Sequence, residues 1–159
     1  MISMIRLRKA RTDDAELVRL IRTELIPLSH TVRPLDAHII RELPLRFRHG
    51  TTYVAALSKT SPPIAFIHFE VMGETLLIYT LATHPEHRNR QWGKKLMAHA
   101  EANGMAHQCK AVRLHVDCIN TKALHFYAKL GYHIIGCIPA IQCYELHKSL
   151  TPALHPSML

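Results

Sequence analysis

The stretch from Leu81 to Met97, LATHPEHRNRQWGKKLM, most constrains what this chain can fold into. It begins at the end of an apolar segment and passes through a polar turn. It then continues with the spacing of an amphipathic helix, whose apolar side carries Trp92, Leu96 and Ala100. The stretch therefore predicts a strand, a loop and the start of a helix.

The predicted turn is cationic. Its basic residues are Arg88, Arg90, Lys94 and Lys95, and only Glu86 opposes them. The first N–H groups of a helix have no intrahelical acceptor and the helix dipole is positive there, so an anion would meet oriented donors as well as basic side chains. Gly93 would let a ligand approach the backbone. The turn thus favours a phosphate or pyrophosphate site, with a solvated basic helix start as an equal alternative on these residues alone.

A second stretch, NTKALHFYAKLGY from Asn120 to Tyr132, makes the pattern specific. Together the two stretches resemble the GNAT superfamily of N-acetyltransferases. In that family the motif after the fourth strand reads Arg or Gln, two residues, Gly, one residue, then Gly or Ala, and these places hold Arg88, Gln91 and Gly93. The later helix reads Asn, two residues, Ala, two residues, Phe-Tyr, three residues, then Gly-Phe or Gly-Tyr. The chain matches it with Asn120, Ala123, Phe126, Tyr127, Gly131 and Tyr132.

The resemblance implies that acetyl-CoA is the cosubstrate and that its acetyl group passes directly to an amine. The pantetheine arm would lie between the fourth and fifth strands, and a backbone N–H near Leu81 would face the thioester oxygen. The resemblance assigns cofactor contacts to Leu81, Ala82, Thr83, Arg88, Asn89, Arg90, Gln91, Trp92, Gly93, Lys94, Asn120, Ala123, Phe126 and Tyr127. Tyr127 is also the catalytic candidate that would hydrogen-bond to the leaving thiolate, although in isolation it would be interpreted as a core aromatic.

The acceptor amine must lose a proton before it attacks, which for a lysine-like pKa of about 10.4 costs roughly 4.6 kcal/mol at pH 7. Many members of the family carry Glu or His on strand four for this purpose, two residues before the position of Leu81. This chain has Tyr79 there, which is a poor base at neutral pH. Either Tyr79 orders a water, or a neighbour assists, the candidates being His68, Glu70 and His84; an ordinary structural role is the alternative for each of these.

The segment between the first two predicted helices is rich in basic residues, namely Arg33, Arg41, Arg46, Arg48, His30, His38 and His49. In the family this segment shapes the acceptor site. We therefore expect a primary amine of a small molecule or peptide, with an anionic group beside the amine as a hypothesis. Solvation of these arginines at the surface is the alternative.

Composition limits the other function classes. The net charge of +8 favours anionic partners, but the cations are scattered, and with only 6% aromatic residues little is available for base stacking. The spacings His84-x-x-His87 and His115-x-x-Cys118 could suit zinc, but the first pair flanks a proline and the second extends beyond a strand, so we predict no metal. We expect neither nucleic acid nor a membrane as partner. A homodimer is left open. Two alternatives to a transferase also stay open: a CoA-binding protein without transfer activity, because Gln91 and Tyr79 depart from the family pattern, and a basic nucleic-acid-binding module, because of the net charge.

The four cysteines, Cys109, Cys118, Cys137 and Cys143, form no Cys-x-x-Cys pair, so we expect buried free thiols in a cytoplasmic protein.

Periodicity and turn residues predict the order of the elements. The first half should contain a strand at Ile5–Leu7, a helix capped by Asp13 and ending at Pro27, a short helix capped by Asp36 and cut by Pro44, strands at Thr51–Leu57 and Ile64–Val71, and the strand ending at Leu81. The second half should contain a helix at Gln91–His107, a strand at Ala111–Val116, a helix over 121–130 with Gly131 after it, strands at Tyr132–Gly136 and Ile141–Leu146, and a tail over 151–159. With the resemblance, this order predicts a single α/β domain over 1–150 with the GNAT fold. It would have a mixed, mostly antiparallel sheet of about seven strands, of which the fourth and fifth are parallel and splayed, flanked by about four helices.

Overall fold

The computed structural model describes residues 4–28 and 37–150. Seven strands form one sheet in the order β1-β2-β3-β4-β5-β7-β6. The elements are β1 (Met4–Leu7), α1 (Ala10–Leu20), η1 (Ile21–Leu25), η2 (Ile26–Leu28), α2 (Ala37–Arg46), β2 (Thr51–Ala56), β3 (Ala65–Met72), β4 (Thr75–Thr83), η3 (Pro85–His87), α3 (Trp92–Ala106), β5 (Ala111–Asp117), α4 (Thr121–Lys129), β6 (His133–Ile138), η4 (Pro139–Ile141) and β7 (Cys143–Ser149). All neighbouring strands are antiparallel except β4 and β5, which are parallel. The predicted fold is therefore confirmed.

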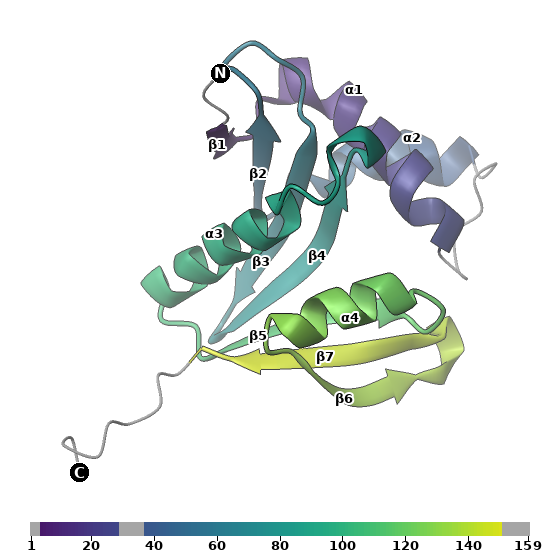
Figure 1. Ribbon diagram of the computed structural model, residues 1–159, viewed down its shortest axis with the longest axis vertical. Helices are drawn as coiled ribbons and strands as arrows, with labels where there is room; N and C mark the ends of the chain where they lie inside the picture. Colours follow the sequence, from purple (N-terminus) through teal and green to yellow (C-terminus); the bar gives the residue numbers. More distant parts are fainter. Residues whose placement is uncertain (1–3, 29–36, 151–159) are drawn as a thin grey trace.

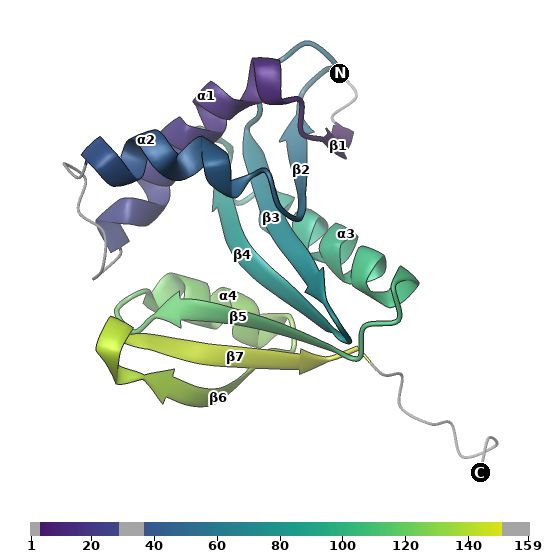
Figure 2. The ribbon, with the colours of Figure 1, turned by 180° about the vertical axis from the view of Figure 1, so that it is seen from behind.

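Alternation along the central strands creates two cores, one on each face of the sheet. On β3, Ile67 faces the core formed with α3 and α4, whereas Phe66 faces the core formed with α1 and α2. Figure 1 shows α3 and α4 over one face, and Figure 2 shows α1 and α2 over the other face of β2 to β4. The position of a residue in the alternation along β3 therefore decides whether its side chain faces α3 and α4 or faces α1 and α2.

The pairing of β4 with β5 stops halfway along both strands. It runs from Thr75 opposite Ala111 to Ile78 opposite Leu114, although β4 continues to Thr83 and β5 to Asp117. On the other edge of β4, His68 pairs with Thr80 and Phe69 with Ile78, so Tyr79 is an extra residue in a β-bulge. Because a bulge bends a strand, it accounts for the divergence of β4 from β5, which is visible in Figure 1.

Several local predictions about the first helices are wrong. Asp13 does not cap α1, which begins at Ala10; instead its carboxylate, 1% exposed, accepts the Lys9 N–H at 2.7 Å and binds Arg6 at 2.7 Å and 3.0 Å. Pro44 lies inside α2, which ends two residues after it. A proline removes only one helical hydrogen bond, so near the end of a helix it need not stop the helix at once.

Other boundaries differ more mildly. Pro27 does not end the first helix, because helical turns of π and 3-10 type continue to Leu28. The final strands, β6 and β7, lie slightly later in the chain than predicted. The predicted cap at Asp36 lies outside the described residues.

The predictions for the last helix are confirmed. The Asn120 side chain accepts the Ala123 N–H at 3.2 Å, and Gly131 follows α4 with a φ of 92°. The expectation of buried thiols holds for Cys109 but is wrong for Cys137, which is exposed because β6 is an edge strand. None of the helices in the described part of the chain is long and apolar enough to cross a membrane.

Two turn glycines allow a matched stability test. A Cβ at Gly50 (φ +80°) would lie 2.4 Å from the Phe69 carbonyl oxygen, whereas a Cβ at Gly73 (φ +61°) would have no heavy atom within 4 Å. Gly73→Ala should therefore cost only the left-handed strain of about 1–2 kcal/mol. Gly50→Ala should cost roughly 3 kcal/mol or more, because β2 and β3 must also move apart. Urea unfolding measures both losses, and equal losses would contradict the close approach.

Candidate functional site

The unpaired end of β4 forms one side of the site. Leu81, Ala82 and Thr83 remain paired with β3 but have no pairing with β5. A strand edge held rigidly by its other neighbour presents backbone donors and acceptors that need a partner. This edge can therefore bind an extended polar chain as an additional strand.

The start of α3 lies close after this edge and has no side-chain cap. Its N-cap residue, Gln91, has a left-handed backbone (φ 65°, ψ 20°), and Asn89 also has a positive φ of 62°. No side chain of the described residues caps the first N–H groups of this 15-residue helix, which lie next to the exposed Arg90 and Lys94. This arrangement suits an anion. The left-handed φ also explains why a glycine would be favoured where Gln91 stands.

Three elements meet at Gly93. A Cβ on this residue would lie 3.1 Å from the Phe126 ring and 3.8 Å from the Leu81 side chain. Gly93 therefore lets α4 pack closely against α3 and the end of β4. The approach of a ligand to its backbone, expected from the sequence, stays a prediction.

Arg88 binds a carboxylate that is distant in sequence. Its guanidinium is paired with the Glu24 carboxylate of η1, whose side chain is 11% exposed. Glu24 lies 64 positions away in sequence, and no spacing pattern signals such a pair. A guanidinium has five N–H donors, so Arg88 can keep this partner and still donate to an anion.

Tyr127 lies in the core on the α3 and α4 face, where its ring packs against those of Phe126 and Tyr132. The side chain is 8% exposed, and burial raises its pKa well above the ordinary value. The neighbouring Tyr132 hydroxyl donates to Glu101 at 2.9 Å, whereas the Tyr127 hydroxyl has no hydrogen-bond partner among the described residues. Tyr127 is therefore a protonated donor without an acceptor.

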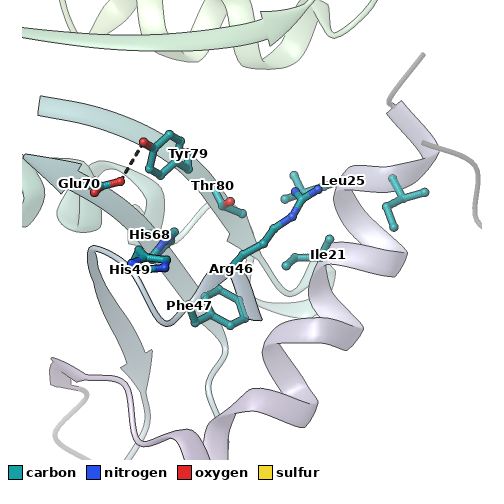
Figure 3. A pocket seen from close by; sticks show the side chains of 10 residues that line it. Ile21, Leu25, Arg46, Phe47, His49, His68, Glu70, Tyr79 and Thr80 are labelled. Atoms are coloured by element: carbon teal, nitrogen blue, oxygen red, sulfur yellow. Dashed lines mark hydrogen bonds between the residues drawn. The ribbon is translucent and has the colours of Figure 1, made fainter. Parts of the chain in front are cut away.

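The opposite face of the sheet carries a pocket of about 480 Å³. It is lined by Ile21, Leu25, Ile26, Arg46, Phe47, His49, His68, Glu70, Tyr79 and Thr80. The apolar residues come mainly from the helical segments, and the last four come from β3 and β4 (Figure 3). Because Tyr79 and Thr80 also belong to the unpaired end of β4, the pocket borders the strand edge described above.

Tyr79 is held by a carboxylate. Its hydroxyl donates to Glu70 Oε2 at 3.0 Å, a bond drawn in Figure 3. Burial, followed by this hydrogen bond and the negative charge of Glu70, raises the Tyr79 pKa. Tyr79 is therefore protonated at neutral pH and serves as a donor.

The two histidine candidates have structural roles. His68 is 3% exposed, and its Nδ1 is hydrogen-bonded to Thr52 Oγ1 at 2.7 Å. Burial lowers the pKa of His68. His84 caps η3 by accepting the Glu86 N–H at Nδ1, at 3.1 Å.

Only part of the predicted basic segment lines the pocket. Arg46 and His49 do, whereas Arg41 and Arg48 are exposed away from it. Arg33, His30 and the side chain of His38 lie outside what the structure describes. Within the described residues, no three side chains of the metal-binding types gather at one place.

A sheet that opens between two parallel strands, with a basic helix start after one of them, defines the class of GNAT-fold acyltransferases. The chain belongs to the Acetyltransferase (GNAT) family, whose model matches residues 16–132. No curated protein is similar enough in sequence to be counted as a match.

Solved structures agree with this fold. The chain is similar to Ard1 from Thermoplasma volcanium (20% identity, 96% of this chain and 100% of that chain, TM-score 0.74). It is similar to the PaiA N-acetyltransferase from Thermoplasma acidophilum in complex with coenzyme A (18% identity, 94% and 99%, TM-score 0.73). It also resembles nourseothricin acetyltransferase (21% identity, TM-score 0.61), where the match covers 64% of this chain and 66% of that chain.

The lowered pKa of His68 predicts that the fold loses stability in mild acid. The unfolded chain takes up a proton near the ordinary histidine pKa of about 6.5, whereas folded His68 resists it. The contribution is fully present above pH 6.5 and is lost as the pH falls below that value. The melting temperature should therefore decrease from pH 7.5 to pH 5.

His68→Gln should flatten this dependence, because glutamine can keep a hydrogen bond to Thr52 but does not titrate. His125→Gln, at an exposed position of α4, is the control and should keep the wild-type slope. A His68→Gln protein with an unchanged slope would refute this assignment.

Proposed function

We propose that the protein is a cytoplasmic N-acetyltransferase that transfers the acetyl group of acetyl-CoA to a primary amine of a small molecule or peptide. Residues 1–150 would form the acetyltransferase domain and 151–159 a tail. The observation that carries this proposal is the unpaired end of β4, where Leu81 and Phe126 of α4 lie beside Gly93 at the start of α3. Tyr127, whose hydroxyl has no partner among the described residues, follows Phe126 on α4. PaiA, one of the similar structures, is described in complex with coenzyme A, which supports the choice of cosubstrate.

The residues would divide the binding of acetyl-CoA among three elements. The N–H groups at the start of α3, with Arg88, Arg90 and Lys94, would bind the pyrophosphate, and the left-handed Asn89 and Gln91 would direct the backbone there. Trp92 anchors that helix start in the core, with 8% of its surface exposed. The backbone of Leu81, Ala82 and Thr83 would bind the pantetheine arm, with Phe126 beside it.

Acetyl-CoA supplies an acetyl group bound as a thioester, and the chain would stabilise the charges that develop on its transfer. A backbone N–H near Leu81 would donate to the carbonyl oxygen. Tyr127 would donate a hydrogen bond to the sulfur as it leaves. Reference pKa values near 10 for tyrosine and 8.5 for a thiol make full proton transfer uphill by about 2 kcal/mol, and burial of Tyr127 increases that cost. Its role would therefore be a hydrogen bond, with solvent completing the protonation.

The acceptor would enter through the pocket on the face opposite Tyr127. The wall formed by Ile21, Leu25 and Phe47 is apolar, while Arg46 and His49 add basic groups. In Figure 3 the Arg46 side chain extends across the pocket towards the segment that carries Leu25. An amine that carries an anionic group would suit this combination.

The first test combines calorimetry with an assay of thiol release. The wild-type protein should bind coenzyme A and acetyl-CoA, and it should release free thiol when amines are added. The panel contains spermidine, free amino acids and acidic tripeptides with a free N-terminus. If neither coenzyme A nor acetyl-CoA binds, the transferase proposal is wrong, and binding without thiol release would favour a CoA-binding protein without transfer activity.

The same panel tests the anionic group. Arg46→Gln should raise the KM of an acidic acceptor about fivefold, the loss expected for one exposed charged contact of about 1 kcal/mol. Arg48→Gln is the matched control, since Arg48 does not line the pocket. Spermidine as the fastest acceptor, or equal effects of the two substitutions, would contradict an anionic acceptor.

Tyr127→Phe separates catalysis from folding. Its hydroxyl has no described partner, so its removal should change the stability by less than about 0.5 kcal/mol. Loss of a hydrogen bond to a charged sulfur, about 1.5–3 kcal/mol, should reduce kcat by roughly 10- to 100-fold. The dissociation constant of acetyl-CoA should stay near that of the wild type.

Tyr132→Phe is the control for this substitution. It loses the hydrogen bond to Glu101, so it should lower the stability by about 1 kcal/mol and leave kcat unchanged. A Tyr127→Phe protein with wild-type kcat would show that the hydroxyl does not act on the thiolate.

A further inference from the structure

The family motifs do not assign, in this chain, the residue that accepts the proton of the acceptor amine. The groups that line the pocket can be compared for this role. The titratable and charged groups that line the pocket are Arg46, His49, His68, Glu70 and Tyr79. They come from the end of α2, the turn after it, β3 and β4, whereas η1 and η2 contribute only the apolar Ile21, Leu25 and Ile26 to the lining. Each can be judged by its hydrogen bonds.

Three of the five groups are unsuited to take the proton. A guanidinium such as that of Arg46 stays protonated in proteins. Tyr79 is already a hydrogen-bond donor, to Glu70. His68 is 3% exposed and its Nδ1 is hydrogen-bonded to Thr52, so its ring is poorly accessible to an acceptor amine.

Glu70 has the right position and a free oxygen. It follows His68 by two residues on β3, so both side chains lie on the pocket face. Oε2 accepts the Tyr79 hydroxyl, while Oε1 has no partner among the described residues. Tyr79 is the bulged residue at which β4 diverges from β5. Because the Tyr79 hydroxyl is bonded to Glu70, the carboxylate is no farther than the length of one tyrosine side chain from the strand edge where the thioester would be bound.

We propose that Glu70 accepts the proton of the acceptor amine and that Tyr79 positions its carboxylate. This rests on the proposed N-acetyltransferase function. The ammonium of the acceptor first pairs with Glu70 and gives one proton to Oε1, directly or through one water. The neutral nitrogen then forms the C–N bond, and the C–S bond breaks with its electron pair leaving on sulfur. The nitrogen, which is cationic after the attack, releases its second proton to solvent to give the neutral amide, and solvent protonates the thiolate.

The base would thus stand on β3, one strand away from the place where the family motif puts it. Tyr79 fills the usual place on β4 and cannot act as a base, but its hydroxyl is directed at a carboxylate that can. The bulge supplies the geometry, because an extra residue turns the Tyr79 side chain to the same face as Glu70. Tyr79 stands on β4 where a base is usual, and Glu70 on β3 would supply the base in its place.

Glu70→Gln tests the proposal, assayed with the fastest amine of the panel described above. The glutamine can still accept the Tyr79 hydrogen bond, so folding and acetyl-CoA binding should be unchanged. At pH 7 kcat should fall by about 10²- to 10⁴-fold, the usual contribution of a general base. The remaining rate should rise about tenfold per pH unit up to the pKa of the amine, because the acceptor must then arrive already neutral, and a merely structural role would not produce that slope.

Three further variants make the outcome decisive. Glu74→Gln, the same change in an exposed ion pair with Lys110, should behave as wild type. Tyr79→Phe should lower kcat about tenfold without the steep pH dependence, as expected of a positioning residue. If His49→Gln and not Glu70→Gln produces the loss and the slope, His49 is the base and the proposal is wrong.

Wild-type activity is measured in the same series. Active wild type with an equally active Glu70→Gln protein overturns the role of Glu70 and leaves the transferase function intact. A wild type without activity on any amine of the panel overturns both.

Discussion

The interruption of β-pairing between β4 and β5 is the constraint on which the rest of the structure depends. Parallel strands normally continue their ladder as far as both extend, because each lost pair leaves backbone groups without partners. Here the ladder stops at Ile78 and Leu114 while both strands go on. The bulge at Tyr79 bends β4 away, and pairing with β3 keeps its end ordered. The sheet is thereby divided at its centre without losing its cohesion.

The divided sheet places different chemistry on its two faces. On one face, α3 and α4 are brought together by the contact of Phe126 with Gly93, and Tyr127 is buried beside them. On the other face, α1 and α2 cover β2 to β4 and leave the pocket with Glu70 and Tyr79. A group bound at the edge of β4 could then be reached from both faces. The ion pair between Arg88 and Glu24 links the loop before α3 to the helical wall of the pocket, so the two faces are not mechanically independent.

The sequence was sufficient for the architecture and for the elements around the site. The helix at α3, the Asn120 cap and the order of strand, helix and strand at β4, α3 and β5 were all predicted and are present. The failures have local causes. Asp13 satisfies the usual pattern of a cap, but the nearby Arg6 on β1 captures its carboxylate. The sequence could suggest Glu70 only as one of several candidates, because its selection depends on the β-bulge and on the engagement of His68, which are tertiary facts.

Local rules are broken repeatedly within a short distance of the end of β4. The strand carries a bulge, Asn89 and Gln91 adopt a backbone that favours glycine, α3 starts without a side-chain cap, and the hydroxyl of Tyr127 has no partner among the described residues. The other left-handed non-glycine residues, Gln108 and Gln142, stand at helix ends, where such a conformation is common. Each departure costs stability, and a fold tolerates several together where a ligand can repay them on binding. The same reasoning explains why the well-capped α4 lies directly beside the uncapped α3: one helix is built to hold its position, and the other leaves its first N–H groups available.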